Sequence, residues 1–188
     1  CTPAMRERAL AEIALPTLAG LRAEGRPFVG VLFVGLMIGG DGAPRVIEYN
    51  CRLGDPEAQP LLFGLRGEVV PSLFAAARGE LRAGHLPGCA AATVVLASAG
   101  YPRGAAPAAE IFGLDDAAAL PGVKVYHAGT RRDGAAWMAT GGRVLGVCAR
   151  AEDLAEALAR ADAACERITF AGAQRRRDIG ARALARRS

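Results

Sequence analysis

The chain has 188 residues, 52% hydrophobic and 22% charged, enough apolar material for one ordinary domain or for a small domain plus part of another. This composition excludes wholesale disorder, and no run approaches the roughly 20 apolar residues of a membrane-spanning helix, so we expect no membrane partner. The net charge of +4 lies mainly in an arginine-rich tail, Arg175 to Arg187, and aromatic residues are only 5%, which argues against nucleic-acid binding.

The five cysteines are scattered and form no CxxC pair, so we expect buried thiols, no disulfide framework and a cytoplasmic setting. The chain starts at Cys1, without an initiator Met and without the basic and apolar regions of a signal peptide. The simplest interpretation is that something upstream has been removed, although the sequence leaves open whether Cys1 is a genuine start.

The first predicted element is a helix over residues 2–21. Its apolar side chains recur at roughly helical spacing, Thr2 suits the N-cap position and Pro3 the first helical position. Pro16 lacks a backbone N–H, so we expect it to break or kink this helix near its middle.

A hairpin is predicted next. The run over residues 28–38 is too apolar for a surface strand and indicates a buried one, whereas residues 45–50 alternate like a second strand. The glycines at 39, 40 and 42 provide the turn signal between them. Two short helical stretches follow, near residues 61–65 and 69–77.

Glycine and proline cluster over residues 79–88, which indicates a boundary between a first domain, residues 1–80, and a second, residues 88–188. In the second domain strands outnumber helices, which indicates a small α+β barrel or sandwich. Its predicted elements are strands over residues 91–98, 123–127 and 143–148, a weaker strand over residues 135–139, and an amphipathic helix over residues 152–168.

The end of the hairpin carries the residues best suited to chemistry. Alternate side chains of a strand share a face, so Glu48 and Asn50 are expected to point the same way, about 6–7 Å apart along the chain. A carboxylate and an amide oxygen so placed suit Mg²⁺, which prefers oxygen and is often shared with nucleotide phosphates. By spacing alone, an edge strand with a solvated face is the more common explanation.

Three charged residues follow. Arg52 brings a planar cation that suits a phosphate or carboxylate group. Asp55 and Glu57 add negative charge in a turn closed by Pro56, where a substrate ammonium could be held. Equally, Arg52 and either acid could form a surface ion pair of little consequence, and the two acids could simply fix the turn.

The run VIEYNCRLGDPEAQP, residues 46–60, resembles the signature of glycinamide ribonucleotide synthetases, in which Glu-x-Asn is followed by Arg-x-Gly-Asp-Pro-Glu. The similarity extends in order along nearly the whole chain, with departures at Arg175, where Tyr is usual, and near Ala139, where Thr is usual. The other similar segments are ALPT at 14–17, GVLFVGLMI at 30–38, VVLAS and GYP at 94–102, HAGT at 127–130, GGRVLGV at 141–147 and RDIG at 177–180.

The resemblance implies an α+β chain, the carboxyl half of an ATP-grasp lobe followed by a small C-terminal domain. It also implies an ATP-dependent ligase of purine biosynthesis that needs Mg²⁺ or Mn²⁺. This enzyme joins glycine to 5-phosphoribosylamine through a glycyl phosphate, and it releases glycinamide ribonucleotide, ADP and phosphate. The metal ligands of the family match Glu48 and Asn50.

The remaining roles are hypotheses. We assign Arg52 a catalytic role at the γ-phosphate or acyl phosphate, and Asp55 and Glu57 the orientation of glycine or of metal-bound phosphates. Arg143, after two glycines, could meet a ribose phosphate, or it could be a surface arginine beside an ordinary turn. His127 could act in acid–base chemistry, although a hydrogen-bonded histidine at a strand end is the more common case. Tyr49, Tyr126 and Trp137 are expected in the core.

The N-terminal domain and first ATP-grasp lobe of the family have no counterpart in this chain. We therefore expect a C-terminal portion that is inactive alone and works with the missing N-terminal part of the same enzyme. One rival is another ATP-grasp carboxylase or ligase, which the run Gly54 to Glu57 argues against. The other is a non-catalytic fragment, which predicts exposed apolar surface on the hairpin. Oligomeric state, ATP binding by the isolated chain and the phosphoribosylamine ligands stay open.

Overall fold

The computed structural model describes residues 2–67, 69–82, 84, 86–104 and 106–185. The question of a genuine start at Cys1, and the arginines at 186 and 187 of the basic tail, fall outside the described residues. The chain divides into two compact units, residues 1–54 with 68–85 and residues 55–67 with 86–188. None of the described helices combines the length and the apolar character needed to cross a membrane.

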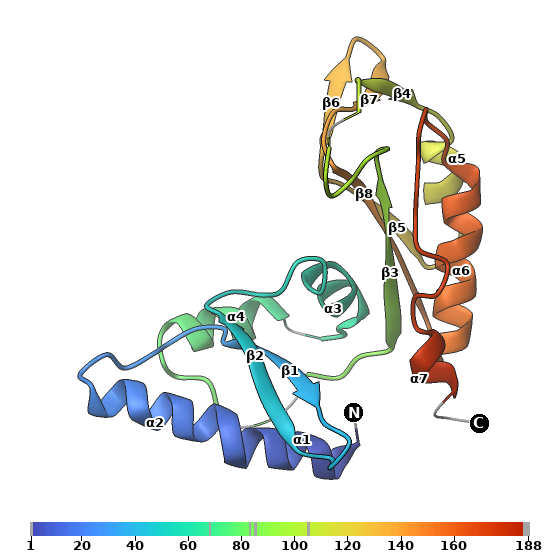
Figure 1. Cartoon of the computed structure of the whole chain (residues 1–188). Helices are drawn as coiled ribbons and strands as arrows, with labels where there is room; N and C mark the ends of the chain where they lie inside the picture. Colours follow the sequence, from blue (N-terminus) through green and yellow to red (C-terminus); the bar gives the residue numbers. More distant parts are fainter. Residues whose placement is uncertain (1, 68, 83, 85, 105, 186–188) are drawn as a thin grey trace. The chain divides into compact units, whose positions relative to one another are not determined.

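The first unit begins with a helical segment whose hydrogen-bond pattern changes midway. It runs through α1 (Pro3–Ala9), a π-helical turn (Leu10–Ala14) and α2 (Leu15–Ala23), as Figure 1 shows. The Thr2 hydroxyl accepts a hydrogen bond from the Met5 N–H at 3.2 Å, which confirms the predicted N-cap. The Leu15 N–H bonds to the Leu10 carbonyl, five residues back, just before Pro16. The α-helical pattern is interrupted as predicted, but the helix does not end there.

An antiparallel hairpin of β1 (Phe33–Ile38) and β2 (Pro44–Asn50) follows, as predicted. The prediction that residues 28–38 form a buried strand is wrong. The strand starts only at Phe33, and Met37 and Ile38 are 58% and 43% exposed. Apolar composition buries a strand only where neighbours cover both of its faces, and this sheet has two strands. The unit ends with α4 (Val69–Ala77), whose bounds match the prediction.

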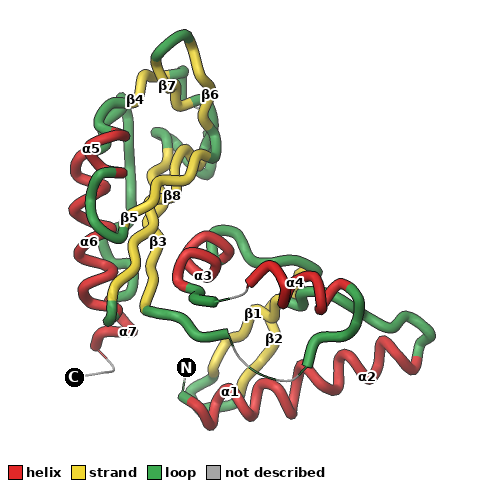
Figure 2. The backbone as a smooth tube through the Cα atoms, turned by 180° about the vertical axis from the view of Figure 1, so that it is seen from behind, coloured by secondary structure: helices red, strands yellow, loops and turns green. Residues whose placement is uncertain are grey.

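The second unit contains two antiparallel sheets of three strands each (Figures 1 and 2). In the larger sheet β8 (Arg143–Ala151) lies between β3 (Ala90–Ala97) and β5 (Val123–His127). In the smaller one β7 (Ala136–Ala139) lies between β4 (Ala109–Ile111) and β6 (Thr130–Asp133). The four strands predicted here are confirmed, and β4 and β6 are additional.

Helices cover both faces of the larger sheet. On one face lies α6 (Leu154–Arg167), with α5 (Leu114–Ala118) against it; the Asp153 carboxylate caps α6 by accepting from the Glu156 N–H at 2.8 Å. On the other face α3 (Ala58–Gly64) contacts β3 and β8. The alternation of β3 explains both layers, because Ala92, Val94 and Leu96 point to α6 while the residues between them point to α3. The short α7 (Ala181–Ala185) ends the described chain.

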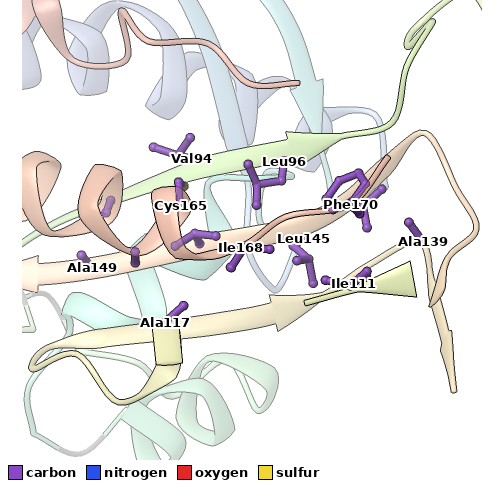
Figure 3. Close-up of a cluster of buried hydrophobic side chains, with 14 residues drawn as sticks. Val94, Leu96, Ile111, Ala117, Ala139, Leu145, Ala149, Cys165, Ile168 and Phe170 are labelled. Carbon is purple, nitrogen blue, oxygen red and sulfur yellow. The ribbon is translucent and has the colours of Figure 1, made fainter. Parts of the chain in front are cut away.

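The core of the second unit lies between the larger sheet and α6 (Figure 3). Small side chains of α6 (Ala157, Ala161, Ala164) are fully buried, which lets the helix approach the sheet closely. After α6 the chain runs back past the strand ends, where Thr169 pairs with Phe112 and Gln174 with Ala97. The mixture of helices and antiparallel sheets confirms the predicted α+β class.

Candidate functional site

Glu48 and Asn50 lie on one face of β2, as the strand alternation predicts. The Asn50 Nδ2 donates a hydrogen bond to the Glu48 Oε1 at 3.2 Å. Gly35 lies opposite Glu48 in the register, and a Cβ at Gly35 would come within 3.0 Å of the Glu48 side chain. Because Gly35 has no side chain, it provides the space that the Glu48 side chain occupies.

This pair fits a divalent cation that is shared with other ligands. The two side chains supply one carboxylate and one amide oxygen, and they are neighbours, since the Asn50 amide nitrogen lies 3.2 Å from the Glu48 Oε1. Among the described residues, no group of three or more acidic, histidine or cysteine side chains is placed to hold a metal ion. Mg²⁺ beside a nucleotide is commonly held by one or two protein oxygens, and water and phosphate oxygens supply its remaining ligands.

Arg52 follows the strand in an exposed position. Its Nη1 donates to the Leu53 carbonyl oxygen at 2.8 Å. That bond engages one of the five N–H donors of the guanidinium. Within the described residues of the first unit, Arg52 makes no ion pair.

Asp55 instead pairs with Arg143 of β8, in the second unit. The Arg143 Nη2 donates to the Asp55 Oδ2 at 2.9 Å, and Nη1 lies 3.4 Å from the Asp55 carbonyl oxygen. Both side chains are more than one-third exposed, so solvent weakens the attraction. From the sequence we had assigned these residues to different substrate groups. They are 88 positions apart, so no local sequence pattern indicates that they pair.

Glu57 immediately precedes α3 but makes no capping hydrogen bond with its side chain. It is exposed, and it borders a shallow pocket with Pro60, Leu61 and Cys89. The structure therefore brings Asp55 and Arg143 together and leaves Glu57 apart from both in its polar contacts.

A pocket of about 490 Å³ opens beside Arg143 in the second unit. Tyr101 lines it, and a Cβ on Gly142 would come within 2.6 Å of the Tyr101 ring, so the glycine permits this close approach. The Gln174 Nε2 donates to the carbonyl oxygens of Ser98 and Tyr101, at 2.9 and 3.1 Å, and fixes another wall. This volume suits a small organic ligand with an anionic group at Arg143.

In the sequence, Arg175 was noted as the start of the arginine-rich tail and as a departure from the family pattern, not as a site residue. In the structure its side chain is 9% exposed, it pairs with Asp162 and Glu166 of α6, and it lines the same pocket. The acidic residues at positions 162 and 166 share a helix face, and that spacing was the available signal. Because Arg175 is buried and has two acidic partners, whereas Arg143 is more exposed and has one, Arg175 is less free than Arg143 to bind an anion.

The aromatic and histidine candidates take structural roles. The His127 Nδ1 lies 3.0 Å from the Thr130 Oγ1, and its ring centroid lies 4.0 Å from that of Trp137. Partial burial lowers the pKa of His127 and favours the neutral ring. These contacts confirm a hydrogen-bonded histidine at a strand end. Tyr49, expected in the core, is 43% exposed, and its hydroxyl lies 2.7 Å from the Thr17 Oγ1.

Two family sequence patterns match the chain. The pattern described as "Phosphoribosylglycinamide synthetase, ATP-grasp (A) domain" matches residues 1–58. The pattern described as "Phosphoribosylglycinamide synthetase, C domain" matches residues 91–182. Together they take in the Glu48–Asn50 pair, Arg52 and the strands of the second unit.

Individual proteins agree with these patterns. A phosphoribosylamine–glycine ligase of Chlorobaculum tepidum is 48% identical over 186 residues, which are 97% of this chain and 43% of the relative. The crystal structure of the phosphoribosylamine–glycine ligase of Thermotoga maritima superposes with a TM-score of 0.81 at 31% identity, over 95% of this chain and 44% of that one. The chain thus spans less than half the length of these relatives.

A third similarity concerns the fold alone. The crystal structure of N5-carboxyaminoimidazole ribonucleotide synthetase from Thermotoga maritima superposes with a TM-score of 0.57 at 15% identity, over 87% of this chain. This likeness shows a shared fold and no more, whereas both family patterns and the 48% identical relative point to phosphoribosylglycinamide synthetases.

Proposed function

The chain belongs to the phosphoribosylglycinamide synthetase family, and we propose that it is a portion of a phosphoribosylamine–glycine ligase. The reaction joins glycine to 5-phosphoribosylamine at the expense of ATP and yields glycinamide ribonucleotide, ADP and phosphate. The observation that carries this proposal is the agreement of both family patterns with the chain, with the Glu48–Asn50 pair inside the first of them.

Glu48 and Asn50 are the proposed ligands of Mg²⁺ or Mn²⁺. When bound, such an ion neutralises phosphate charge during phosphoryl transfer. The 3.2 Å hydrogen bond from the Asn50 Nδ2 to the Glu48 Oε1 holds the two side chains next to each other on one face of the strand, and metal binding would turn the amide oxygen toward the ion. Arg52, with most of its donors unused, is the proposed partner of the γ-phosphate and of the glycyl phosphate that follows.

Arg143 is proposed to bind the ribose phosphate, with Asp55 as the group that orients its guanidinium. The pocket of about 490 Å³ beside Arg143 supports this assignment. Asp55 then has a positioning role and does not bind the glycine ammonium. Glu57, which is exposed and has no capping bond, is the remaining acidic candidate to orient glycine.

The proposal assigns the chain to two domains. Residues 1–80 are proposed as the C-terminal part of an ATP-grasp domain and residues 88–188 as the C-terminal domain. The part of the relatives that this chain does not span is proposed to supply the remaining contacts to ATP, so the isolated chain should be inactive. We place the reaction in the cytoplasm, where purine precursors are made.

The test is complementation. This chain is mixed with the amino-terminal part of the Chlorobaculum tepidum relative, and glycine-dependent ADP release is measured with phosphoribosylamine and Mg²⁺. We expect activity in the mixture, and a fall of at least about tenfold on Glu48→Gln, because one metal ligand is lost. Glu7→Gln removes an exposed carboxylate elsewhere in the first unit and should change the rate less than twofold, roughly, as a surface change does.

Equal rates for Glu48→Gln and the unsubstituted chain would contradict the metal assignment. An inactive mixture whose parts are folded and associated would favour the second candidate, a non-catalytic fragment that associates with other chains. The specific observation behind that candidate is exposed apolar surface on the hairpin, where Val46, Ile47 and Met37 are 39%, 62% and 58% exposed.

A further inference from the structure

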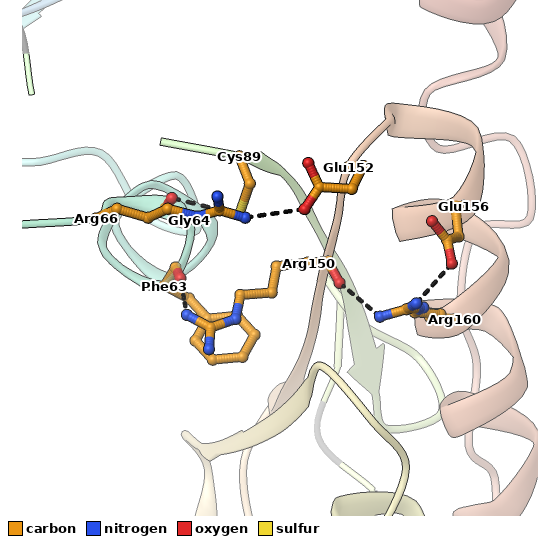
Figure 4. Close-up of polar contacts among 8 residues, drawn as sticks. All are labelled: Phe63, Gly64, Arg66, Cys89, Arg150, Glu152, Glu156 and Arg160. Carbon is orange, nitrogen blue, oxygen red and sulfur yellow. Dashed lines mark hydrogen bonds and ion pairs between the residues drawn. The ribbon is translucent and has the colours of Figure 1, made fainter. Parts of the chain in front are cut away.

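A second cluster of charged residues lies in the second unit, well separated from Arg143. Arg150 and Arg143 both belong to β8, seven residues apart, which at about 3.3 Å per residue is roughly 23 Å. Around Arg150 a pocket of about 440 Å³ is lined by side chains from several elements (Figure 4). These are Arg66 after α3, Cys89 before β3, Glu152 after β8, and Glu156 and Arg160 of α6.

Two of the three arginines have acidic partners. The Arg66 Nη2 donates to the Glu152 Oε1 at 3.0 Å, and the Arg160 Nη2 donates to the Glu156 Oε1 at 2.5 Å. The Glu152 side chain is 85% exposed, so its attraction for Arg66 is largely screened by water. An incoming anion can therefore replace Glu152 at Arg66 at little cost.

Arg150 has no acidic partner within the described residues. Its Nη1 donates to the Phe63 carbonyl oxygen at 3.3 Å, and its guanidinium lies 4.8 Å from the centroid of the Phe63 ring. In β8 the residues from Val144 to Ala149, and Ala151, are buried, yet Arg150 is exposed. The Phe63 contacts hold the guanidinium in place and leave most of its donors for a ligand.

The side chain of Arg160 contacts the backbone of Arg150. The Arg160 Nη1 donates to the Arg150 carbonyl oxygen at 3.1 Å, as Figure 4 shows. Gly122 makes this approach possible, because a Cβ there would come within 2.7 Å of both the Arg160 Nη1 and the Arg150 carbonyl oxygen. The Arg160 guanidinium is thereby engaged by the Glu156 carboxylate and by the Arg150 backbone carbonyl, so Arg66 and Arg150 are the arginines of this pocket with donors for a ligand.

We infer that this pocket, through Arg66 and Arg150, is a binding site for a phosphate group, distinct from the site proposed at Arg143. A phosphate supplies up to two negative charges and three acceptor oxygens, which matches the two guanidinium groups of Arg66 and Arg150. A monocarboxylate offers one charge and two oxygens, which is enough for only one guanidinium group. Free phosphate and a phosphate monoester share this chemistry.

The test uses the 188-residue chain and isothermal titration calorimetry at constant ionic strength, with inorganic phosphate and glycerol phosphate as separate ligands. We expect saturable binding of at least one of them, weakened by about tenfold or more on Arg150→Gln, since a charge-assisted hydrogen bond is lost. Tighter binding of glycerol phosphate would assign the site to a phosphorylated metabolite, and tighter binding of inorganic phosphate to the free ion.

Arg132→Gln is the matched control. Arg132 is also exposed and also lies over an aromatic ring, 5.5 Å from the centroid of Trp137, with its Nε donating to the Gly134 carbonyl oxygen at 3.3 Å. Its replacement removes the same charge and should leave the affinity within about twofold. Arg150→Lys keeps the positive charge and the packing but loses the planar pair of guanidinium donors. It should weaken binding by less than Arg150→Gln.

An equal effect of Arg132→Gln and Arg150→Gln would overturn the inference, because it would show a general charge effect. Loss of binding on Arg143→Gln but not on Arg150→Gln would also overturn it, while supporting the ribose-phosphate site of the proposed function. Absence of saturable binding to a chain whose unfolding transition is normal would overturn it too. The outcome is independent of the ligase assay, so the two proposals fail separately.

Discussion

At the scale of single residues, the ion pair between Asp55 and Arg143 changes what each side chain is free to do. Sequence patterns assign functions one segment at a time, and here they gave one acid to glycine and one arginine to a phosphate. The structure joins the two at 2.9 Å. A carboxylate that orients an arginine leaves the arginine's other donors aimed at a ligand, as supporting residues do in many anion sites.

The pair should matter more for the site than for stability. With side chains 38% and 55% exposed, we expect Asp55→Asn to lower the free energy of unfolding by no more than about 1 kcal/mol. Arg143→Gln made on that background should cost almost nothing further, since the partner is already gone. Urea unfolding of the two single variants and the double variant measures this coupling. A coupling of several kcal/mol would mean that the pair is chiefly structural.

At the scale of elements, glycines mark where backbones come into contact. Gly113 precedes α5 with φ of 77°, and a Cβ there would lie 1.9 Å from the Arg167 carbonyl oxygen at the end of α6. Any side chain at position 113 is therefore disfavoured for two reasons, the left-handed backbone conformation and the contact with the neighbouring helix.

Gly113→Ala should destabilise the second unit by about 2–5 kcal/mol, of which about 1–2 is the backbone conformation and the rest displacement of α6. Gly134→Ala is the control, because Gly134 has φ of 59° but nothing within 4 Å of the added Cβ. It should cost only the conformational part. Urea unfolding followed by the fluorescence of Trp137, the single tryptophan, compares them. Equal losses would show that α6 accommodates the methyl group without displacement.

The elements also show how far sequence reasoning reaches. Local sequence patterns were sufficient to predict α4, β5 and the Thr2 cap, because secondary-structure propensity and helix capping depend on residues only a few positions apart. They missed β6, where Thr130, Arg131, Arg132 and Asp133 have no apolar alternation and form a strand only because β7 pairs with them. They also overestimated the burial of β1, since burial depends on layers that no single segment specifies.

The candidate site divides in the same way. The geometry of Glu48 and Asn50 followed from the two-residue period of a strand. The Asp55–Arg143 pair joins segments 88 positions apart and could not be found without the fold, whereas the acids that bury Arg175 showed only as a spacing on one helix face, 13 and 9 positions before it. The arginine pocket around Arg150 assembles residues from positions 66 to 160, so no local sequence pattern indicates it.

At the scale of the whole molecule, the two units differ in how much apolar surface they bury. Among the described residues, Ile13 is the one buried hydrophobic side chain of the first unit, whereas the rest lie between Ala92 and Phe170 in the second. Since hydrophobic burial is the main favourable term in folding, the first unit should be much the less stable.

We therefore expect the chain to unfold in two steps. Hydrogen exchange followed by mass spectrometry should show rapid exchange in β1 and β2 and slow exchange in β3 and β8. In urea, loss of helical circular dichroism from α1 and α2 should precede the change in Trp137 fluorescence. Simultaneous exchange of both hairpin and sheet would show instead that the chain unfolds as a single cooperative unit.

The pairing of β3 with β8 has a consequence for synthesis of the protein. Thr93 lies opposite Cys148, so β3 leaves the ribosome 55 residues before the middle of its partner strand. At about 5–20 residues per second, this strand waits roughly 3–11 s with its backbone donors and acceptors unpaired. Its run of valine, leucine and alanine side chains is the kind that associates with other nascent strands. The interval between the two strands is therefore the period in which a chaperone would protect this chain most effectively.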